Sequence, residues 1–343
     1  MSCQRGPVRA IFGALGRVAR RDLQSFRSLQ VNNFFLFVAL LMYGAFESGL
    51  APRSAYPFLL LLGFLLLFPL SGDPLARIPR VRRESWPLSA HQRFALRLAS
   101  LALSPVLWIA IAVMASASLA LAALFLTLSI GTQLLLALGR RPAWTPQAKV
   151  PPIPGRLGLL VRKDARQMLT VLDTWVAILL SAGAAVWRVL DRHADPEALP
   201  ILAILIALAL STYAQSLFGL DTPSGHTWYR ASPLSGWKIL LAKDAAFLGV
   251  LLVLLLPVSE LTGLTFGLTA LAVGHIPSVA LRLPVERWRF TGGRVLYAFL
   301  QVIPAIMLSL AAREIGSVFL APALALWAVS LAVCGRRYTE GRR

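Results

Sequence analysis

The segment 198–220 reads ALPILAILIALALSTYAQSLFGL and contains no charged side chain. An α-helix rises about 1.5 Å per residue and the hydrocarbon core of a bilayer is about 30 Å thick, so this segment predicts a transmembrane helix. Stretches of the same kind recur at 33–50, 55–70, 94–115, 117–138, 172–190, 239–258, 261–283, 295–311 and 315–334. The predicted fold class is all-α, a polytopic transmembrane helical bundle of about ten spans.

The composition agrees with this interpretation. Of the 343 residues, 57% are hydrophobic and 14% are charged, whereas soluble domains carry about 25% charged residues. Three of the stretches fit less well than the others. The stretch 55–70 is short, Lys243 and Asp244 lie inside 239–258, and His275 and Pro277 lie inside 261–283.

The formal net charge of +19 is explained by topology. If the N-terminus is cytoplasmic and each stretch crosses once, 30 of the 34 Lys and Arg residues fall on the inner side, and only Arg53, Arg188, Arg192 and Arg313 fall outside. This asymmetry is the positive-inside rule. It predicts a multi-pass protein of the bacterial inner membrane with both termini in the cytoplasm, and it makes a nucleic-acid partner unnecessary.

The chain divides into two weakly related halves. Pro87-Leu88-Ser89 and Pro233-Leu234-Ser235 are 146 residues apart, as are Arg97 and Lys243. A serine in this position can cap a short cytoplasmic helix, which we expect at 85–97 and at 232–243. The predicted organisation is a cytoplasmic amphipathic interfacial helix at 1–32 (a frayed basic tail is the alternative), a first transmembrane half at 33–141, a cytoplasmic linker and helix at 142–171, a second transmembrane half at 172–335, and a basic cytoplasmic tail at 336–343.

The sequence lacks several common motifs of nucleotide-binding, catalytic and metal-binding sites. There is no G-x-x-x-x-G-K-[ST] phosphate loop and no H-E-x-x-H, and two Cys and four scattered His do not give zinc-site spacing. We therefore expect no catalytic residues, no metal and no cofactor in this chain, which is not predicted to be an enzyme. Any ATP hydrolysis is expected on a partner subunit.

One tetrapeptide, Pro223-Ser224-Gly225-His226, resembles the central signature of membrane phosphatidic-acid-type phosphatases. That family also needs an upstream Lys followed by Arg-Pro, and a downstream Ser-Arg with a His and an Asp. The one Arg-Pro pair here, Arg141-Pro142, has Leu134 in place of the Lys, and no Ser-Arg precedes His275. The tetrapeptide is therefore interpreted as a turn.

Polar residues inside the predicted spans are mainly neutral. Such residues are either interhelical hydrogen-bond partners or part of a translocation path. A proton- or sodium-coupled carrier usually keeps carboxylates near the midplane, so we expect an energy source outside the membrane domain. The candidate path residues are Gln133, Tyr213, Gln215 and Gln301.

The order of elements around 218–243 resembles the permease subunits of ABC-2 type transporters. The resemblance is carried by Phe218-Gly219-Leu220-Asp221, by Trp228 to Ser235, and by Lys238-Ile239-Leu240-Leu241-Ala242-Lys243. It implies a membrane subunit of an ABC exporter whose cytoplasmic helices dock a separately encoded ATP-binding subunit. The candidate docking residues are Trp237, Lys238, Lys243, Arg93 and Arg97.

The resemblance leaves the assembly open. Family members commonly have six spans per chain, so either two copies form a homodimer in the lipid or one chain supplies both halves. Two other function classes compete with transport. One is a membrane scaffold or assembly protein, and the other is an integral membrane lipid-modifying enzyme.

Overall fold

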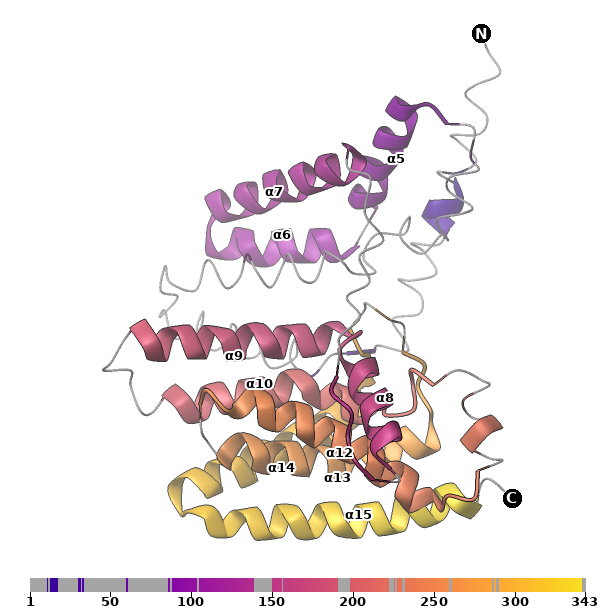
Figure 1. Ribbon diagram of the computed structural model, residues 1–343. Coiled ribbons are helices and arrows are strands. Elements are labelled where there is room, and N and C mark those ends of the chain that lie inside the picture. Colours follow the sequence, from indigo (N-terminus) through magenta and orange to yellow (C-terminus); the bar gives the residue numbers. More distant parts are fainter. Residues whose placement is uncertain are drawn as a thin grey trace. The chain divides into compact units, whose positions relative to one another are not determined.

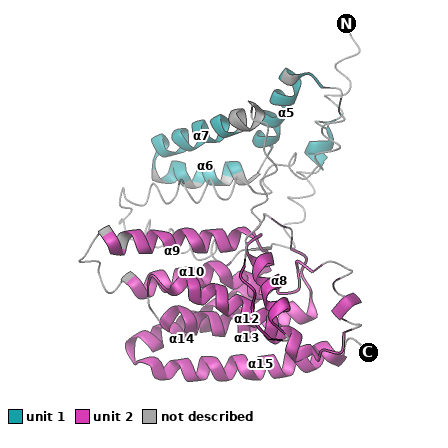
Figure 2. Cartoon of the chain, in the orientation of Figure 1, with its two compact units in different colours: residues 1–28, 42–146 teal, residues 29–41, 147–343 magenta. Residues whose placement is uncertain are grey.

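The computed structural model describes residues 11, 13–17, 30–31, 33, 60, 86, 88–103, 105–138, 150–155, 157–190, 198–221, 225, 227–229, 232–258, 261–285, 287 and 290–340. The chain forms two compact units, unit 1 (1–28 and 42–146) and unit 2 (29–41 and 147–343), which Figure 2 shows in different colours. Strands in the described part are limited to β1 (Gln30–Val31) and β2 (Gly293–Arg294), which pair antiparallel. The all-α prediction is thus confirmed, whereas the predicted spans 33–50 and 55–70 lie outside the described residues except at Asn33 and Leu60.

Unit 1 contains α5 (Ala90–Ala102), α6 (Pro105–Ala117) and α7 (Leu119–Leu138). Ser89 caps α5 as expected: its Oγ accepts a hydrogen bond from the Gln92 N–H at 3.3 Å, and the Gln92 side chain accepts one from the Ser89 N–H at 3.0 Å. This reciprocal pair satisfies donors that the first turn of a helix leaves open.

The prediction of one continuous span at 94–115 is wrong. The first helix ends at Ala102 and the next begins at Pro105. Proline has no N–H to donate and disfavours helical geometry in the residue before it, so the chain breaks there. The two pieces have 13 residues each, about 20 Å of helix, and neither is long enough alone to cross the hydrocarbon core.

The described N-terminal residues 11 and 13–17 are helical. Leu15 is 1% exposed and packs with Leu88 and Leu96 of unit 1, whereas Arg17 is exposed. This turn of helix has an apolar residue facing inward and a cation facing outward, and the rest of the amphipathic helix expected at 1–32 lies outside the described residues except at β1.

Unit 2 is a bundle of helices. Its elements are α8 (Gly158–Met168), α9 (Leu172–Leu190), α10 (Ala198–Ala214), α12 (Gly236–Leu255), α13 (Leu261–Ala280), α14 (Val295–Glu314), the 3-10 turn η3 (Ser317–Phe319) and α15 (Leu320–Glu340). The long helices run side by side, while α8 lies across the end of α12 and makes an angle of 82° with α9 (Figure 1).

The centre of unit 2 is α13, which packs against α10, α12, α14 and α15. Glycines allow the closest of these contacts. A Cβ at Gly274 would lie 2.6 Å from the Ala214 carbonyl oxygen, and one at Gly263 would lie 2.8 Å from the Ala203 carbonyl oxygen. Small residues let neighbouring backbones approach in this way, as is common between membrane helices.

Three helical segments in the described part are long and apolar enough to cross a membrane: Leu261–Ala280, Val295–Glu314 and Ser317–Glu340. A fourth is obtained if the bent pair α8 and α9 counts as one span. These segments agree with a transmembrane protein, but they do not confirm the predicted number of about ten spans.

Candidate functional site

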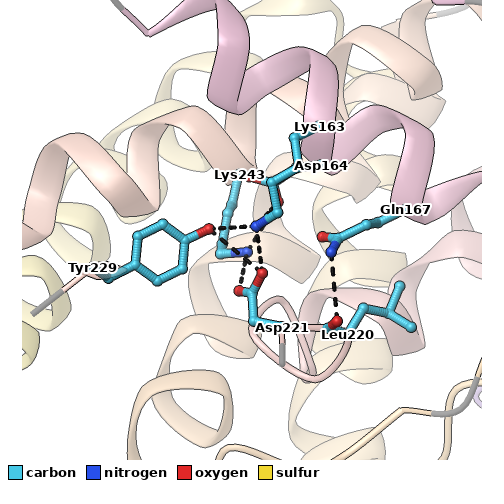
Figure 3. A network of polar contacts seen from close by, with 7 residues as sticks. All are labelled: Lys163, Asp164, Gln167, Leu220, Asp221, Tyr229 and Lys243. Carbon is cyan, nitrogen blue, oxygen red and sulfur yellow. Dashed lines mark hydrogen bonds and ion pairs between the residues drawn. The ribbon is translucent and has the colours of Figure 1, made fainter. Parts of the chain in front are cut away.

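Four charged side chains meet at one end of the unit 2 bundle, and we call them the four-charge cluster. Lys163 and Asp164 lie on α8, Asp221 follows α10, and Lys243 lies on α12 (Figure 3). The Lys243 Nζ lies 2.8 Å from Asp221 Oδ2 and 3.2 Å from Asp164 Oδ1. The Lys163 Nζ donates a hydrogen bond to Asp221 Oδ1 and lies 3.5 Å from Asp164 Oδ1. Three separate segments are therefore joined by charge.

Two aromatic rings complete the cluster. The Tyr229 hydroxyl accepts a hydrogen bond from Lys163 Nζ at 2.6 Å and lies 3.5 Å from Asp221 Oδ1. The Lys243 ammonium lies 4.8 Å from the Phe218 ring centroid and 5.8 Å from that of Tyr229. Cations are attracted to aromatic faces at these distances, so the rings hold the buried ammonium as well as exclude water from it.

Burial makes the cluster sensitive to the loss of any member. Lys243 and Asp164 are each 2% exposed and the Asp221 side chain is fully buried, whereas the Lys163 side chain is 39% exposed. The two lysines and two aspartates balance in charge. Removing one partner from such a group leaves an uncompensated buried charge, which is strongly destabilising.

The electrostatics of the connecting segment follow from this geometry. Burial acts to raise the pKa of Asp221, but the ammonium groups of Lys243 and Lys163 outweigh burial and hold that pKa below its ordinary value. Burial also raises the pKa of the Tyr229 hydroxyl, which Lys243 and Lys163 only partly oppose. Asp221 is therefore a carboxylate, and Tyr229 a neutral hydroxyl, at neutral pH.

The candidate docking residues are distributed over both units. Trp237 is 44% exposed and Lys238 is exposed, with its Nζ 5.6 Å from the Trp237 ring centroid. On α5 of unit 1, Arg93 is exposed and Arg97 is partly buried. Lys243 does not reach the surface, because it belongs to the four-charge cluster.

The two expected cytoplasmic helices differ from each other. The first is a separate short helix, α5, which begins at Ala90. The second is not separate: α12 begins at Gly236 and continues to Leu255 without a break, so 232–243 is a turn followed by the first turns of a long helix. Ser235 stands at the N-cap position of α12 but makes no side-chain capping hydrogen bond.

Two of the four candidate path residues, Gln215 and Gln301, belong to a buried polar network of unit 2, and the side chain of Gln133 lies outside the described residues. Gln215 Nε2 donates to Gln301 Oε1 at 2.8 Å, and Gln301 Nε2 donates to the carbonyl oxygens of Ser211 and Ala270 at 2.9 and 2.6 Å. Tyr213 is 2% exposed. These contacts favour the interpretation of the two glutamines as interhelical hydrogen-bond partners.

Of the four charged residues, the sequence singles out Lys243 as a candidate docking residue and Asp221 only as part of the segment that resembles a family. It gives no reason to group Lys163 and Asp164 with them. The signal that unites them is two unpaired cations and two unpaired anions near predicted helix ends, but sequence does not show which of these charges meet.

Comparison with protein-family models, curated proteins and solved structures finds no match to this chain. Within the described residues, no group of three or more His, Cys, Asp or Glu side chains is arranged to hold a metal ion. The role that the four-charge cluster supports is structural: its ion pairs hold α8, the segment after α10 and the start of α12 together.

Proposed function

We propose that this chain is the membrane-spanning permease subunit of an ATP-binding-cassette exporter and that it docks a separate ATPase. The observation that carries the proposal is the position of the four-charge cluster. Two of its four members, Asp221 and Lys243, lie in the segment that resembles the ABC-2 family, and they pair with Lys163 and Asp164 of α8. The exposed Trp237 and Lys238 precede Lys243 on α12, which continues without a break to Leu255.

The start of α12 is also fixed to α15. The Gly236 N–H donates a hydrogen bond to Thr339 Oγ1 at 2.9 Å, and a Cβ at Gly236 would lie 2.5 Å from the Gly335 carbonyl oxygen. Close-packed elements transmit strain rather than absorb it. A displacement applied at Trp237 would therefore move α12 together with α8 and α15, which is what nucleotide-driven rocking of a permease requires.

A second function, a membrane scaffold without transport, is favoured by one observation. Trp228 and Trp237 are 53% and 44% exposed, and exposed tryptophans near helix ends also serve as anchors at the membrane interface. In that case the cluster would only stabilise the bundle, and no ATPase would be bound.

ATP hydrolysis by purified preparations separates these functions. We expect the chain purified alone to hydrolyse no ATP, and the chain purified mildly from native membranes to bring with it a Walker-motif subunit whose hydrolysis changes when the chain is removed. Failure of any such ATPase to co-purify, or ATP hydrolysis that remains with the isolated chain, would contradict the proposed function.

A further inference from the structure

A second buried group of ionisable residues lies next to the four-charge cluster but faces other helices. Asp244 of α12 and His275 of α13 are both 0% exposed. The His275 Nε2 lies 3.0 Å from each carboxylate oxygen of Asp244, and its Nδ1 lies 3.0 Å from the Ser330 Oγ of α15. Trp327 of α15 donates its indole N–H to Asp244 Oδ2 at 2.9 Å.

One assignment of hydrogens satisfies all of these contacts. The Ser330 hydroxyl donates its one hydrogen to the Ala272 carbonyl oxygen, which leaves the hydroxyl oxygen able to accept from His275 Nδ1. At the other ring nitrogen, the equal distances to Oδ1 and Oδ2 fit an N–H shared between two acceptor oxygens. The Trp327 N–H likewise requires Oδ2 to accept. This arrangement fits an imidazolium paired with a carboxylate.

Asp244 lies well inside its helix rather than at its end. It is eight residues beyond Gly236, about 12 Å along the axis of α12. Burying an ionisable group inside a helix bundle is costly, and within membranes such groups usually mark function, proton relays included.

We propose that Asp244 and His275 form a proton-binding site inside the helix bundle. On release, the Nδ1–H bond of His275 breaks and the proton passes to water, while Nε2–H still donates to Asp244. The pair then changes from neutral to a net charge of −1. A buried unpaired anion is unfavourable, so the deprotonated site favours an arrangement in which α12, α13 and α15 admit water. The proposal does not depend on ATPase docking.

Other charged and titratable groups nearby are already engaged. Lys243, adjacent on α12, pairs with Asp164 of α8 and Asp221. Cys334 and Arg337 of α15 lie close enough to interact electrostatically with one another, and Cys334 with Asp244. The Tyr213 phenol of α10 lies near Lys243, and α14 presents the neutral amide of Gln301 to α13. None of these contacts replaces the donor that Asp244 receives from His275.

Nitrogen NMR of the full chain, labelled with ¹⁵N-histidine in lipid nanodiscs, tests the protonation state. At about pH 8 an unperturbed histidine is largely neutral, because its pKa is about 6.5. We expect one of the four histidines to show two protonated ring nitrogens at this pH. The signal should disappear in His275→Gln and remain in the matched control His91→Gln, which alters an exposed histidine of α5.

In Asp244→Asn the amide can donate to Nε2, so we expect His275 to become neutral with a single protonated nitrogen. This variant keeps the test decisive if His275→Gln does not fold. A wild-type His275 that is already neutral at about pH 8 would overturn the proposal.

Exchange of the proton is tested by potentiometric titration towards alkaline pH. The wild type should release one more proton per chain than Asp244→Asn before it unfolds. In parallel, the difference in fluorescence between the wild type and Trp327→Phe reports the emission of Trp327, and it should change over the same pH range. The corresponding difference for Trp237→Phe, which reports an exposed tryptophan, should not change. A proton that stays bound until the fold is lost would make the pair a purely structural ion pair and would also overturn the proposal.

Discussion

The Lys243 ammonium contacts Asp221 at 2.8 Å although the two residues belong to different structural elements, and both side chains are almost completely inaccessible to solvent. The Lys243 ammonium lies against Asp221 Oδ2, while the Lys163 ammonium donates a hydrogen bond to the other carboxylate oxygen, Oδ1. The strength of the contact therefore depends on charge balance within the four-charge cluster, and the balance can be changed one residue at a time.

Replacing Lys243 with methionine should destabilise the protein by about 3–5 kcal/mol, because it leaves two buried carboxylates with one cation. Unfolding in mixed detergent micelles, followed by circular dichroism, measures the effect. Lys238→Met is the matched control: it removes a lysine from the same helix, but this lysine is exposed, and we expect little change. Adding Asp221→Asn to Lys243→Met should recover part of the loss. Equal stability of the two single lysine variants would contradict this account.

Acid should weaken the cluster through Asp221. The pKa of this carboxyl is held below its ordinary value in the folded state. Its contribution to stability is therefore fully present above the ordinary range of an aspartate, about 3.9, and is lost as the pH falls through the lowered folded-state pKa. We expect the free energy of unfolding of Asp221→Asn to be lower at neutral pH and to depend less on pH in the acid range. Glu314→Gln, which alters a carboxylate whose side chain is 70% exposed, should retain the wild-type profile.

The contact between α12 and α15 gives a steric test. A Cβ at Gly335 would lie 2.6 Å from the Trp237 Cα, so Gly335→Ala should force the helices apart and destabilise the protein by about 1–3 kcal/mol. Gly249→Ala is the control on α12. A Cβ at Gly249 meets nothing within 4 Å, so this variant should be stabilised by about 0.5–1 kcal/mol through helix propensity. Thermal unfolding of both variants measures the difference, and a stabilising Gly335→Ala would show that the contact is not tight.

Docking of the ATPase is tested by Trp237→Ala combined with Lys238→Ala. If these exposed side chains bind the partner, truncation should release it, because a good aromatic anchor contributes about 2 kcal/mol or more. Co-purification measures the loss, while membrane insertion and abundance should stay at the wild-type level. Trp228→Ala is the matched control for an exposed tryptophan. A double variant that retains the full amount of partner, but changes in insertion, would identify a lipid anchor instead.

Topology can be measured independently of function. The distribution of Lys and Arg predicts position 195 outside and position 144 in the cytoplasm. Single cysteines placed there, at Asp195 and at Trp144, should react with a membrane-impermeant reagent from opposite sides. Reaction from the same side would rule out the ten-span topology.

The long helices of unit 2 could be predicted from apolar runs because hydrophobic segments of this length have few alternatives to a helix, although α10 ends at Ala214 and not at the predicted residue 220. The span predicted at 172–190 coincides with α9. The break before Pro105 was missed, although the proline itself is a local signal for it. Apolar composition alone made 94–115 look continuous, and local backbone chemistry overrode it.

The partners of the buried charges could not be predicted, because pairing depends on packing between distant segments. Lys243 and Asp164 are 79 residues apart, and Asp244 and His275 are 31 apart. Asp244, together with Lys243, made the predicted span 239–258 fit poorly, and His275, together with Pro277, did so for 261–283. In the structure each compensates the other, so the two weak predictions have one physical explanation.

If the chain inserts into a membrane as proposed, the order in which these residues leave the ribosome also orders their insertion. Asp164 and Asp221 are synthesised before Lys243, whereas His275 is synthesised after Asp244. A charged side chain at the centre of an inserting helix costs about 2.5–3.5 kcal/mol at the translocon. Lys243 of α12 therefore finds Asp164 and Asp221 already synthesised when it inserts. Asp244 of the same helix has no partner until α13 brings His275. The two helices should thus leave the translocon together, as a hairpin, rather than one after the other.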